Sequence, residues 1–478
     1  MPEAFSHRGI STKHFAWRQV TVVALVVGAV VLWLHGRSLE AFLYLDDFCS
    51  LRNVVALTPD CFMRELLLLQ TGFRPVSMLV YKVARAHFGL NSTGYHAIIL
   101  LLHIANVVQA YLLAFLVTRS RFVALATATV CVYQFVTMDA LWNFGAIFTP
   151  LAALFYWQSM AWYVMSRVGG VRYRVFSAIS FLFALGSKPS AITLPIMLTV
   201  YEWLWQRPIR RQSRNWLRMT IASQWLYYLL AGIFFVQQFL FSSEIRTGAY
   251  TFVITHNVWL SNMKFYLRGW FCDIWPWPWL VAAGILLSVV AWQGRDRVLA
   301  FGGLYVMVAF IPVAFLPYHQ HPFFWYLPQL GMGLLTGQLL RRVRIALAAR
   351  LSMRYRWFLR AVSMLMIASL LVVAVMAPGR RRLDVERWYI TRGNEYRSFI
   401  AQLRHLHPTL PHWSVVAFRR APPLIDSEHL TCLLQVMYND LTVRGIVNWD
   451  ARAAVGDQIE RSIFFRDYQD GFVIEAAP

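Results

Sequence analysis

Two adjacent carboxylates, Asp46 and Asp47, follow the first long apolar stretch of the chain, residues 20–34. The other flank of that stretch is basic and carries Arg8, Lys13 and Arg18. If the stretch crosses a membrane, the acidic pair emerges on the far face, close to the bilayer surface. Paired carboxylates in such a place could supply a general base or a metal ligand.

The two acids cannot share one role, because successive side chains diverge by about 100° in a helix and point to opposite faces in a strand. One of the two therefore enters a cavity while the other supports it. More ionisable residues follow later apolar segments on the same predicted side, and they are Asp139, Lys188, Arg268, Asp273, His319 and His321. Ionisable groups at membrane depth are costly and usually face a cavity or a partner.

Each of these residues also has a plainer alternative role. Asp139 could cap the helix that follows it. Lys188 could extend its amine to the interface, or it could meet a phosphate at a helix N-terminus whose first turn holds Pro189. His319 and His321 could be solvated loop residues, or they could bind a metal or donate to a phosphate.

The composition indicates a membrane protein. Of 478 residues, 58% are hydrophobic and only 14% are charged, whereas soluble domains carry about 25% charged residues. The formal net charge is +22, but the Arg residues gather in short loops at alternating ends of apolar runs, as the positive-inside rule requires. This pattern explains the charge without a nucleic-acid partner.

The apolar runs predict a mostly α-helical, polytopic protein with about eleven transmembrane helices. Residues 219–241 and 279–293 would be the seventh and eighth spans, and Lys188-Pro189 would interrupt the pair formed by the fifth and sixth. The N-terminus would be cytoplasmic, and residues 62–70 and 76–88 would form short interfacial helices. Residues 1–378 would form the membrane domain, and residues 379–478 a small extracytoplasmic α/β domain. Within that domain we predict strands at 413–418 and 442–448 and a helix at 427–439.

The five cysteines show no spacing typical of a zinc site. Cys49 and Cys61 lie on the predicted far side of the first span and could pair in an oxidising compartment, although the sequence does not determine the connectivity. A nucleotide-binding glycine motif and a hydrolase nucleophile motif are both missing, which argues against nucleotide-driven chemistry and ordinary hydrolysis.

Short motifs occur in a fixed order over residues 20–340. They are Tyr44-Leu45-Asp46-Asp47, Phe73-Arg74-Pro75, Gly94-Tyr95-His96, His103 with Asn106, Lys188-Pro189 with Leu194-Pro195, and Tyr326-Leu327-Pro328. This order resembles the GT-C class of glycosyltransferases, and within it the protein O-mannosyltransferase-like group and its bacterial relatives. The chain departs from that group at Pro189, where an acidic residue is expected after the lysine.

The resemblance implies transfer of a sugar from a polyprenyl-phosphate carrier to a glycan, lipid or protein hydroxyl, with inversion, on the outer face of the cell's inner membrane. Asp46 would act as the general base with Asp47 in support, and Asp139 would be the third catalytic acid. It implies no organic cofactor and leaves open a divalent cation held with the help of Asp139. The residues that would contact phosphate or sugar are Arg74, Lys188, Arg268, His319 and His321.

Two other functions fit the same far-side charges. A lipid-linked glycan transporter would need cationic groups at a cavity but no base. An O-antigen ligase or polymerase would join glycans by a related reaction from a diphosphate-linked donor.

Overall fold

The structure is a computed structural model that describes residues 17–67, 74–206, 216–241, 251–274, 276, 284, 296–350, 356–448 and 462–475. The chain forms two compact units. The helical unit comprises residues 1–36, 100–139 and 148–379, and the mixed unit comprises residues 37–99, 140–147 and 380–478. The predicted domain boundary near residue 379 stays a prediction.

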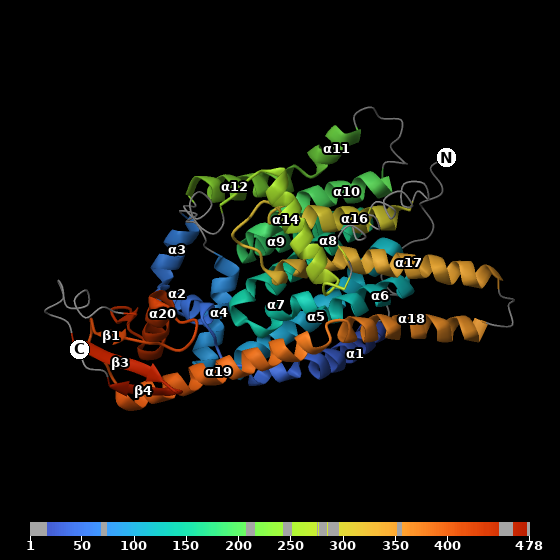
Figure 1. The fold of residues 1–478 in the computed structure, drawn as a ribbon. Helices are drawn as coiled ribbons and strands as arrows, with labels where there is room; N and C mark the ends of the chain where they lie inside the picture. The colour runs from blue at the N-terminus through green and yellow to red at the C-terminus, as the bar shows by residue number, and fades with distance from the viewer. Residues whose placement is uncertain are drawn as a thin grey trace. The chain divides into compact units, whose positions relative to one another are not determined.

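The helical unit is a bundle of α-helices (Figure 1). Two helices, α5 (Ser92–Thr118) and α7 (Met138–Trp142), have residues in both units. The other α-helices of the bundle are α1 (Trp17–His35), α6 (Arg121–Val132), α8 (Phe148–Gly169), α9 (Val171–Ser187), α10 (Leu194–Gln206), α11 (Trp216–Ser223), α12 (Trp225–Phe241), α14 (His256–Trp270), α16 (Arg297–Phe310), α17 (Gln329–Arg350) and α18 (Arg356–Met376).

Three helical segments of the described chain are long and apolar enough to cross a membrane, namely Gln19–Glu40, Ser92–Thr118 and Trp357–Met376. A pair bent by 57°, Arg121–Val132 with Phe135–Trp142, would make a fourth. The protein is thus a mostly helical, multi-pass membrane protein, whereas the number of about eleven spans stays a prediction. The segment predicted as the eighth span, residues 279–293, lies almost entirely outside the described residues.

Glycines allow α17 to approach its neighbours closely. A Cβ on Gly331 would lie 2.7 Å from the carbonyl oxygen of Gly302 in α16, and one on Gly333 would lie 2.8 Å from the Thr127 side chain in α6. Small residues at such contacts let helix backbones pack tightly where lipid provides no hydrophobic drive. These contacts build the interior of the bundle around α6, α16 and α17.

Residues 219–241, the predicted seventh span, are helical apart from a break of one residue, and their crossing of the membrane stays a prediction. The segment divides into α11 and α12 at Gln224, which is fully buried. The Gln224 amide donates to the hydroxyl of Tyr163 at 2.8 Å and accepts from that of Thr199 at 2.7 Å. A buried amide must be satisfied, so the chain turns where Gln224 reaches its partners.

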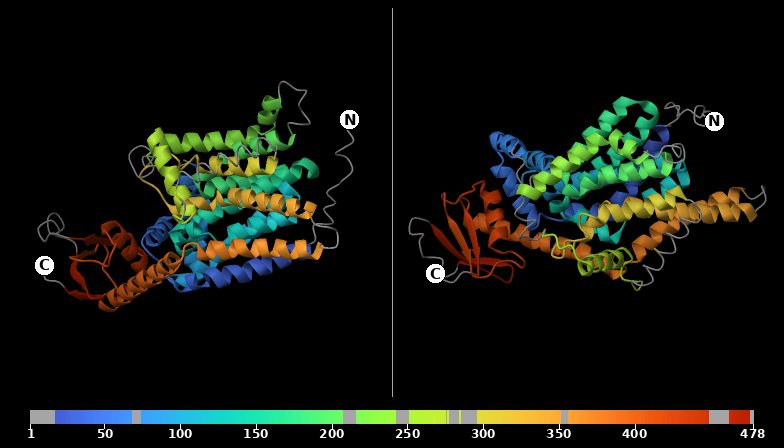
Figure 2. Two further views of the ribbon diagram at one scale, coloured as in Figure 1. Left: turned by 45° about the vertical axis from the view of Figure 1, so that its right-hand side comes forward. Right: turned by 90° about the horizontal axis from the view of Figure 1, so that it is seen from above.

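The mixed unit carries helices from the first loop and from the C-terminal region, and one sheet whose strands lie side by side in Figure 2. The sheet order is β2-β1-β3-β4, with β1 parallel to β2 and β3, and β3 antiparallel to β4. The elements are η2 (Gly36–Glu40), α2 (Asp46–Ala56), α3 (Pro59–Leu67), α4 (Pro75–Phe88), α19 (Arg380–Leu406), β1 (Val415–Phe418), α20 (Ser427–Tyr438), β2 (Arg444–Val447), β3 (Ile463–Gln469) and β4 (Phe472–Glu475).

The structure confirms the α/β character predicted for the C-terminal region, because β1, α20 and β2 fall on the predicted strand, helix and strand. The long helix α19 was not predicted. Its sequence is rich in Arg, and this charge obscures a buried stripe formed by Tyr389, Tyr396, Phe399 and Leu403. A helix with one apolar stripe and a charged remainder is stable when the stripe packs against a core.

Candidate functional site

The acidic pair forms the first turn of α2. The residue before it, Leu45, has φ 35°, a left-handed conformation that leucine rarely adopts. Such strain persists only where the surrounding structure imposes it, and it clusters at functional sites. At this position the positive end of the helix dipole favours the carboxylates of Asp46 and Asp47.

Asp47 points inward and is only 1% exposed. Its Oδ2 accepts the backbone N–H of Tyr44 at 2.7 Å, while its own N–H donates to the Tyr44 carbonyl at 2.9 Å. Burial raises the pKa of Asp47 to about 7, an effect that the N–H groups of Tyr44 and Gly145 oppose. Asp47 therefore closes the turn that starts α2.

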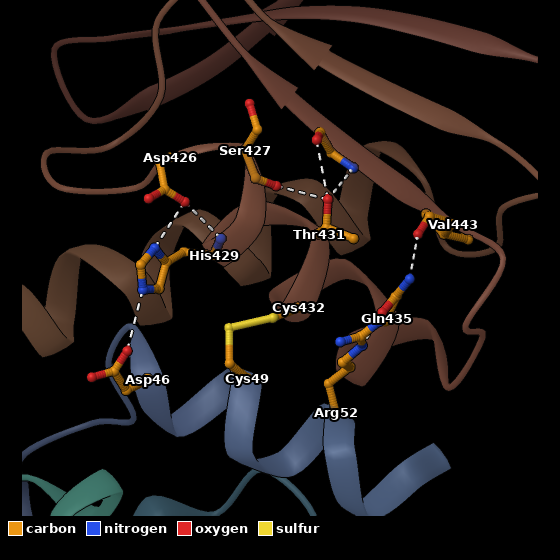
Figure 3. Close-up of a disulfide and its surroundings, with 11 residues drawn as sticks. Asp46, Cys49, Arg52, Asp426, Ser427, His429, Thr431, Cys432, Gln435 and Val443 are labelled. Atoms are coloured by element: carbon orange, nitrogen blue, oxygen red, sulfur yellow. Dashed lines mark hydrogen bonds and ion pairs between the residues drawn. A yellow bond between two sulfur atoms is a disulfide. The ribbon is translucent and has the colours of Figure 1, made fainter. Parts of the chain in front are cut away.

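Asp46 points outward, and its side chain is 75% exposed. Its Oδ1 lies 3.3 Å from Nε2 of His429, which begins α20, and Nδ1 of His429 lies 2.8 Å from Oδ1 of Asp426 (Figure 3). Hydrogen bonds to two carboxylates require both ring nitrogens to be donors, as in the imidazolium form. The hydrogen bond with Asp46 raises the pKa of His429 to about 9, so His429 is cationic at neutral pH.

Helices α2 and α20 are joined at three successive places on one face of each helix (Figure 3). The pairs are Asp46 with His429, Cys49 with Cys432 in a disulfide, and Arg52 Nε with Gln435 Oε1 at 2.9 Å. All three pairs have the same sequence separation of 383 residues. The two helices therefore run parallel, in register, along rows of residues three apart.

The cysteine pairing differs from the prediction. Cys49 bonds to Cys432, with their Cα atoms 4.8 Å apart, and Cys61 is in the thiol form. The suggested Cys49–Cys61 bond was wrong, because Cys49 faces α20 rather than α3. A short sequence separation had favoured Cys61, but geometry and not separation decides which cysteines can bond.

An aromatic cluster lies beside the acidic turn. The Tyr44 ring makes edge contacts with Trp388, Tyr389 and Tyr396 at centroid distances of 5.1–6.3 Å. Trp388 also lines an open hollow of about 330 Å³ along α19. Aromatic rings interleaved with charged groups are suited to a polar ligand that has apolar faces, such as a sugar. The remaining lining residues are Asp384, Arg387, Thr391, Arg392 and Glu395.

Arg74 also belongs to the mixed unit and precedes the first turn of α4. It is half-buried, and its positive charge acts on the hydroxyl of Tyr81. That hydroxyl donates to the carbonyl of Phe144 at 3.0 Å. Arg74 thus lies in the same unit as Asp46 and Asp47, as a cationic neighbour of Tyr81.

Lys188 lies in the helical unit, at the break between α9 and η5 (Pro189–Thr193). The structure confirms the predicted interruption at Lys-Pro. The amine is buried, donates to Thr149 Oγ1 at 2.7 Å and lies 4.3–5.0 Å from the ring centroids of Phe148, Phe323 and Phe324. The cavity beside it has a volume of about 10 Å³, room for about one water molecule.

His319 and His321 contact two of the phenylalanines that surround Lys188. Their rings lie 4.5 Å apart, His321 stacks on Phe323 at 4.9 Å, and His319 lies 5.6 Å from Phe324. The helical unit therefore brings Lys188 and both histidines around one pair of rings. Their contact with phosphate or sugar stays a prediction.

Arg268 and Asp139 also belong to the helical unit. Arg268, in the last turn of α14, pairs with Asp273 at 2.7 Å, and both side chains reach solvent. Asp139 is half-buried in the first turn of α7, next to the bend after α6. The role of each in binding or catalysis stays a prediction.

A metal site would need several clustered donor side chains. Within the part of the chain that the structure describes, no three His, Cys, Asp or Glu side chains gather so as to hold a metal ion. The described donors therefore do not form a metal cage.

His429 and Asp426 were missed from the sequence. A signal was present, because His429 precedes Cys432 by three residues just as Asp46 precedes Cys49. Reading that signal required the Cys49–Cys432 pairing, which the sequence alone does not determine.

The chain matches no known family model and no curated protein. Among solved structures it is similar to the archaeal oligosaccharyltransferase AglB from Archaeoglobus fulgidus in complex with an inhibitory peptide and a dolichol-phosphate, with 11% identity and a TM-score of 0.51 over 92% of this chain. The chain spans only 65% of that AglB chain. It also matches ArnT from Cupriavidus metallidurans bound to undecaprenyl phosphate, with 14% identity and a TM-score of 0.48 over 95% of this chain and 93% of that one.

At this identity the likeness to AglB shows the fold. It confirms the predicted resemblance to membrane glycosyltransferases of the GT-C class as a resemblance of fold.

Proposed function

We propose that the protein is a membrane glycosyltransferase that moves a sugar from a polyprenyl-phosphate donor to the hydroxyl of a glycan, lipid or protein acceptor. One observation carries the proposal. In a chain with this fold, Asp46 presents an exposed carboxylate at the start of a helix and is held there by a residue from the C-terminal region. An accessible, fixed carboxylate is what a general base needs.

The reaction begins when the hydroxyl oxygen of the acceptor attacks the anomeric carbon of the donor sugar. The bond from that carbon to the phosphate oxygen breaks, and its electron pair stays on the phosphate. Asp46 takes the hydroxyl proton and later releases it to water. Attack from the side opposite the phosphate inverts the anomeric centre, and the products are the glycoside and polyprenyl phosphate.

The phosphate that leaves carries negative charge, which a cation in a dry site stabilises best. We assign this role to Lys188, the cation held in an aromatic cavity with His319 and His321 nearby. Because that cavity has room for about one water, the phosphate would displace the Phe324 side chain on entry. Arg74 and Arg268 are further candidates for the donor, and Asp139 for the sugar hydroxyls.

We place the reaction on the extracytoplasmic face of the inner membrane. The Cys49–Cys432 disulfide supports this side, because disulfides persist in oxidising compartments and are rare in the cytosol. The basic N-terminal segment supports the opposite, cytoplasmic side for the N-terminus.

Mass spectrometry of surface glycans from cells with and without the protein tests the proposal and identifies the product. We expect one glycan class to lose a single sugar in the deletion strain. Purified protein should then use a polyprenyl-phosphate sugar as donor. Use of a polyprenyl-diphosphate oligosaccharide instead would point to a ligase or polymerase, and movement of the lipid-linked sugar across the bilayer without transfer would point to a transporter.

A further inference from the structure

We propose that His429 is a positioning residue for Asp46, and that the α2–α20 pairing exists to bring it there. This inference rests on the proposed function, in which Asp46 is the base. It assigns to the C-terminal region a part in completing the acidic site.

The geometry of Asp46 shows why a partner is needed. An exposed aspartate in the first turn of a helix has several accessible rotamers. The hydrogen bond from His429 Nε2 to Oδ1 selects one of them, and the other oxygen points away from His429 (Figure 3). In the proposed reaction, that second oxygen accepts the proton from the substrate hydroxyl.

His429 is itself held in place from the other side. Asp426 caps α20 by accepting the backbone N–H of His429 at 2.8 Å, and the same Oδ1 accepts Nδ1–H of the ring at 2.8 Å. The ring is therefore fixed at both nitrogens, and its side chain is 22% exposed. A carboxylate that orients a histidine toward a reacting group is a recurrent device in catalytic sites.

Among the charged groups around α20, two aspartates contact His429. Asp46 approaches from α2 and Asp426 from the residue before α20. The basic side chains from neighbouring elements contact α20 at its other end, where Arg52 meets Gln435, Arg85 meets Val436 and Asn439, and Arg404 meets Met437. The hydrogen bonds to Asp46 and Asp426 raise the pKa of His429 more than burial lowers it, so His429 stays cationic.

The disulfide and the Arg52–Gln435 pair hold α20 beside α2 and so keep His429 next to Asp46. Cys49 lies one helical turn after Asp46, and Cys432 lies one turn after His429, so the covalent bond fixes both helices beside the ionic pair. Arg52 and Gln435 then set the register one turn further on. Without this register, His429 would lose contact with Asp46, because the ion pair alone is partly exposed and weak.

The test compares full-length protein carrying His429→Ala or His429→Gln in proteoliposomes, with a polyprenyl-phosphate sugar donor and the acceptor found above. His412→Ala is the matched control, because His412 belongs to the same unit but pairs with Asp440 at 2.7 Å, whereas Asp46 pairs with His429. We expect His429→Ala to lower kcat by about 10- to 100-fold with little change in either KM. His429→Gln, which keeps a donor, should lose less.

Added imidazole supplies a second readout that a purely structural role would not move. It should restore a large part of the kcat of His429→Ala and leave His412→Ala unchanged. Unaltered kcat in His429→Ala, or an equal loss in His412→Ala with no response to imidazole, overturns the positioning role. Absence of transfer by the unaltered protein from any lipid-linked sugar would instead overturn the proposed function.

Discussion

Cys49 and Cys432 form a disulfide across 383 residues of sequence and join the first loop of the chain to its C-terminal region. The bond lies between two further pairs with the same separation, Asp46 with His429 and Arg52 with Gln435. An acidic pair that the sequence places after an apolar segment is thereby tied to a helix encoded near the end of the chain.

The disulfide predicts the products of a non-reducing digest. Mass spectrometry of the oxidised protein should find the peptide containing Cys49 linked to the peptide containing Cys432, with Cys61 as a thiol. Replacing both bonded cysteines by serine should lower the free energy of unfolding by about 2–4 kcal/mol, read as an earlier thermal transition. Cys61→Ser is the control and should leave the transition in place. A Cys49–Cys61 peptide would contradict the structure.

The burial of Asp47 predicts that the stability of the protein depends on pH. The pKa of Asp47 rises from 3.8 unfolded to about 7 in the fold, so folding favours the protonated form. The contribution of protonated Asp47 to the free energy of unfolding is fully present below pH 3.8 and is lost as pH rises through about 7. Asp47→Asn cannot ionise and still accepts the Tyr44 N–H, so it should lose less stability than the unaltered protein between about pH 5 and about pH 8. If the temperature of the thermal transition changes by the same amount in both proteins between these pH values, Asp47 does not titrate in this range.

The acidic pair and the helix break at Lys188 could be predicted because both depend on local sequence. A proline fixes a break by removing a donor and clashing with the preceding turn, and an acidic pair after an apolar run is visible directly. The structure exposes 75% of the Asp46 side chain and 1% of Asp47, a difference that the sequence does not show. Their chemical roles remain predictions.

The partners of these residues could not be predicted, because they come from distant parts of the chain. Nothing near Asp46 in the sequence indicates His429, and nothing near Lys188 indicates Phe323 and Phe324. The interruption at Gln224 was missed for the same reason, since its buried amide is satisfied by Tyr163 and Thr199 from other helices. Long-range contacts of this kind are set by tertiary packing and not by local periodicity.

We expect the mixed unit to be sensitive to a side chain at position 145. A Cβ there would lie 2.9 Å from Asn143 Oδ1 and 3.3 Å from both Asp46 Cβ and Asp47 Oδ1. Gly145→Ala should therefore displace the acidic turn and lower sugar transfer by about tenfold or more. Gly303→Ala is the control, because a Cβ at Gly303 meets no atom within 4 Å. Equal transfer rates in the two variants would show that the turn tolerates displacement.

We expect removal of the Lys188 charge to impair the use of the lipid-phosphate donor. Lys188→Met keeps most of the apolar stem among the rings but removes the charge that faces Phe324 and the donor to Thr149. We expect kcat/KM for the lipid-phosphate sugar to fall by about 100-fold. Thr149→Val removes the hydrogen-bond partner and keeps the charge, so it should cost far less. A larger loss in Thr149→Val would make the hydrogen bond, rather than the charge, the functional feature.

The most direct measurement of the central claim is the rate at which purified Asp46→Asn transfers labelled sugar from a polyprenyl-phosphate donor in proteoliposomes. The substitution keeps the size of the side chain and an oxygen for His429, and it removes the basic carboxylate. The account predicts a loss of at least about 100-fold in kcat, typical of removing a general base, with the disulfide still formed. Transfer at the unaltered rate would contradict it.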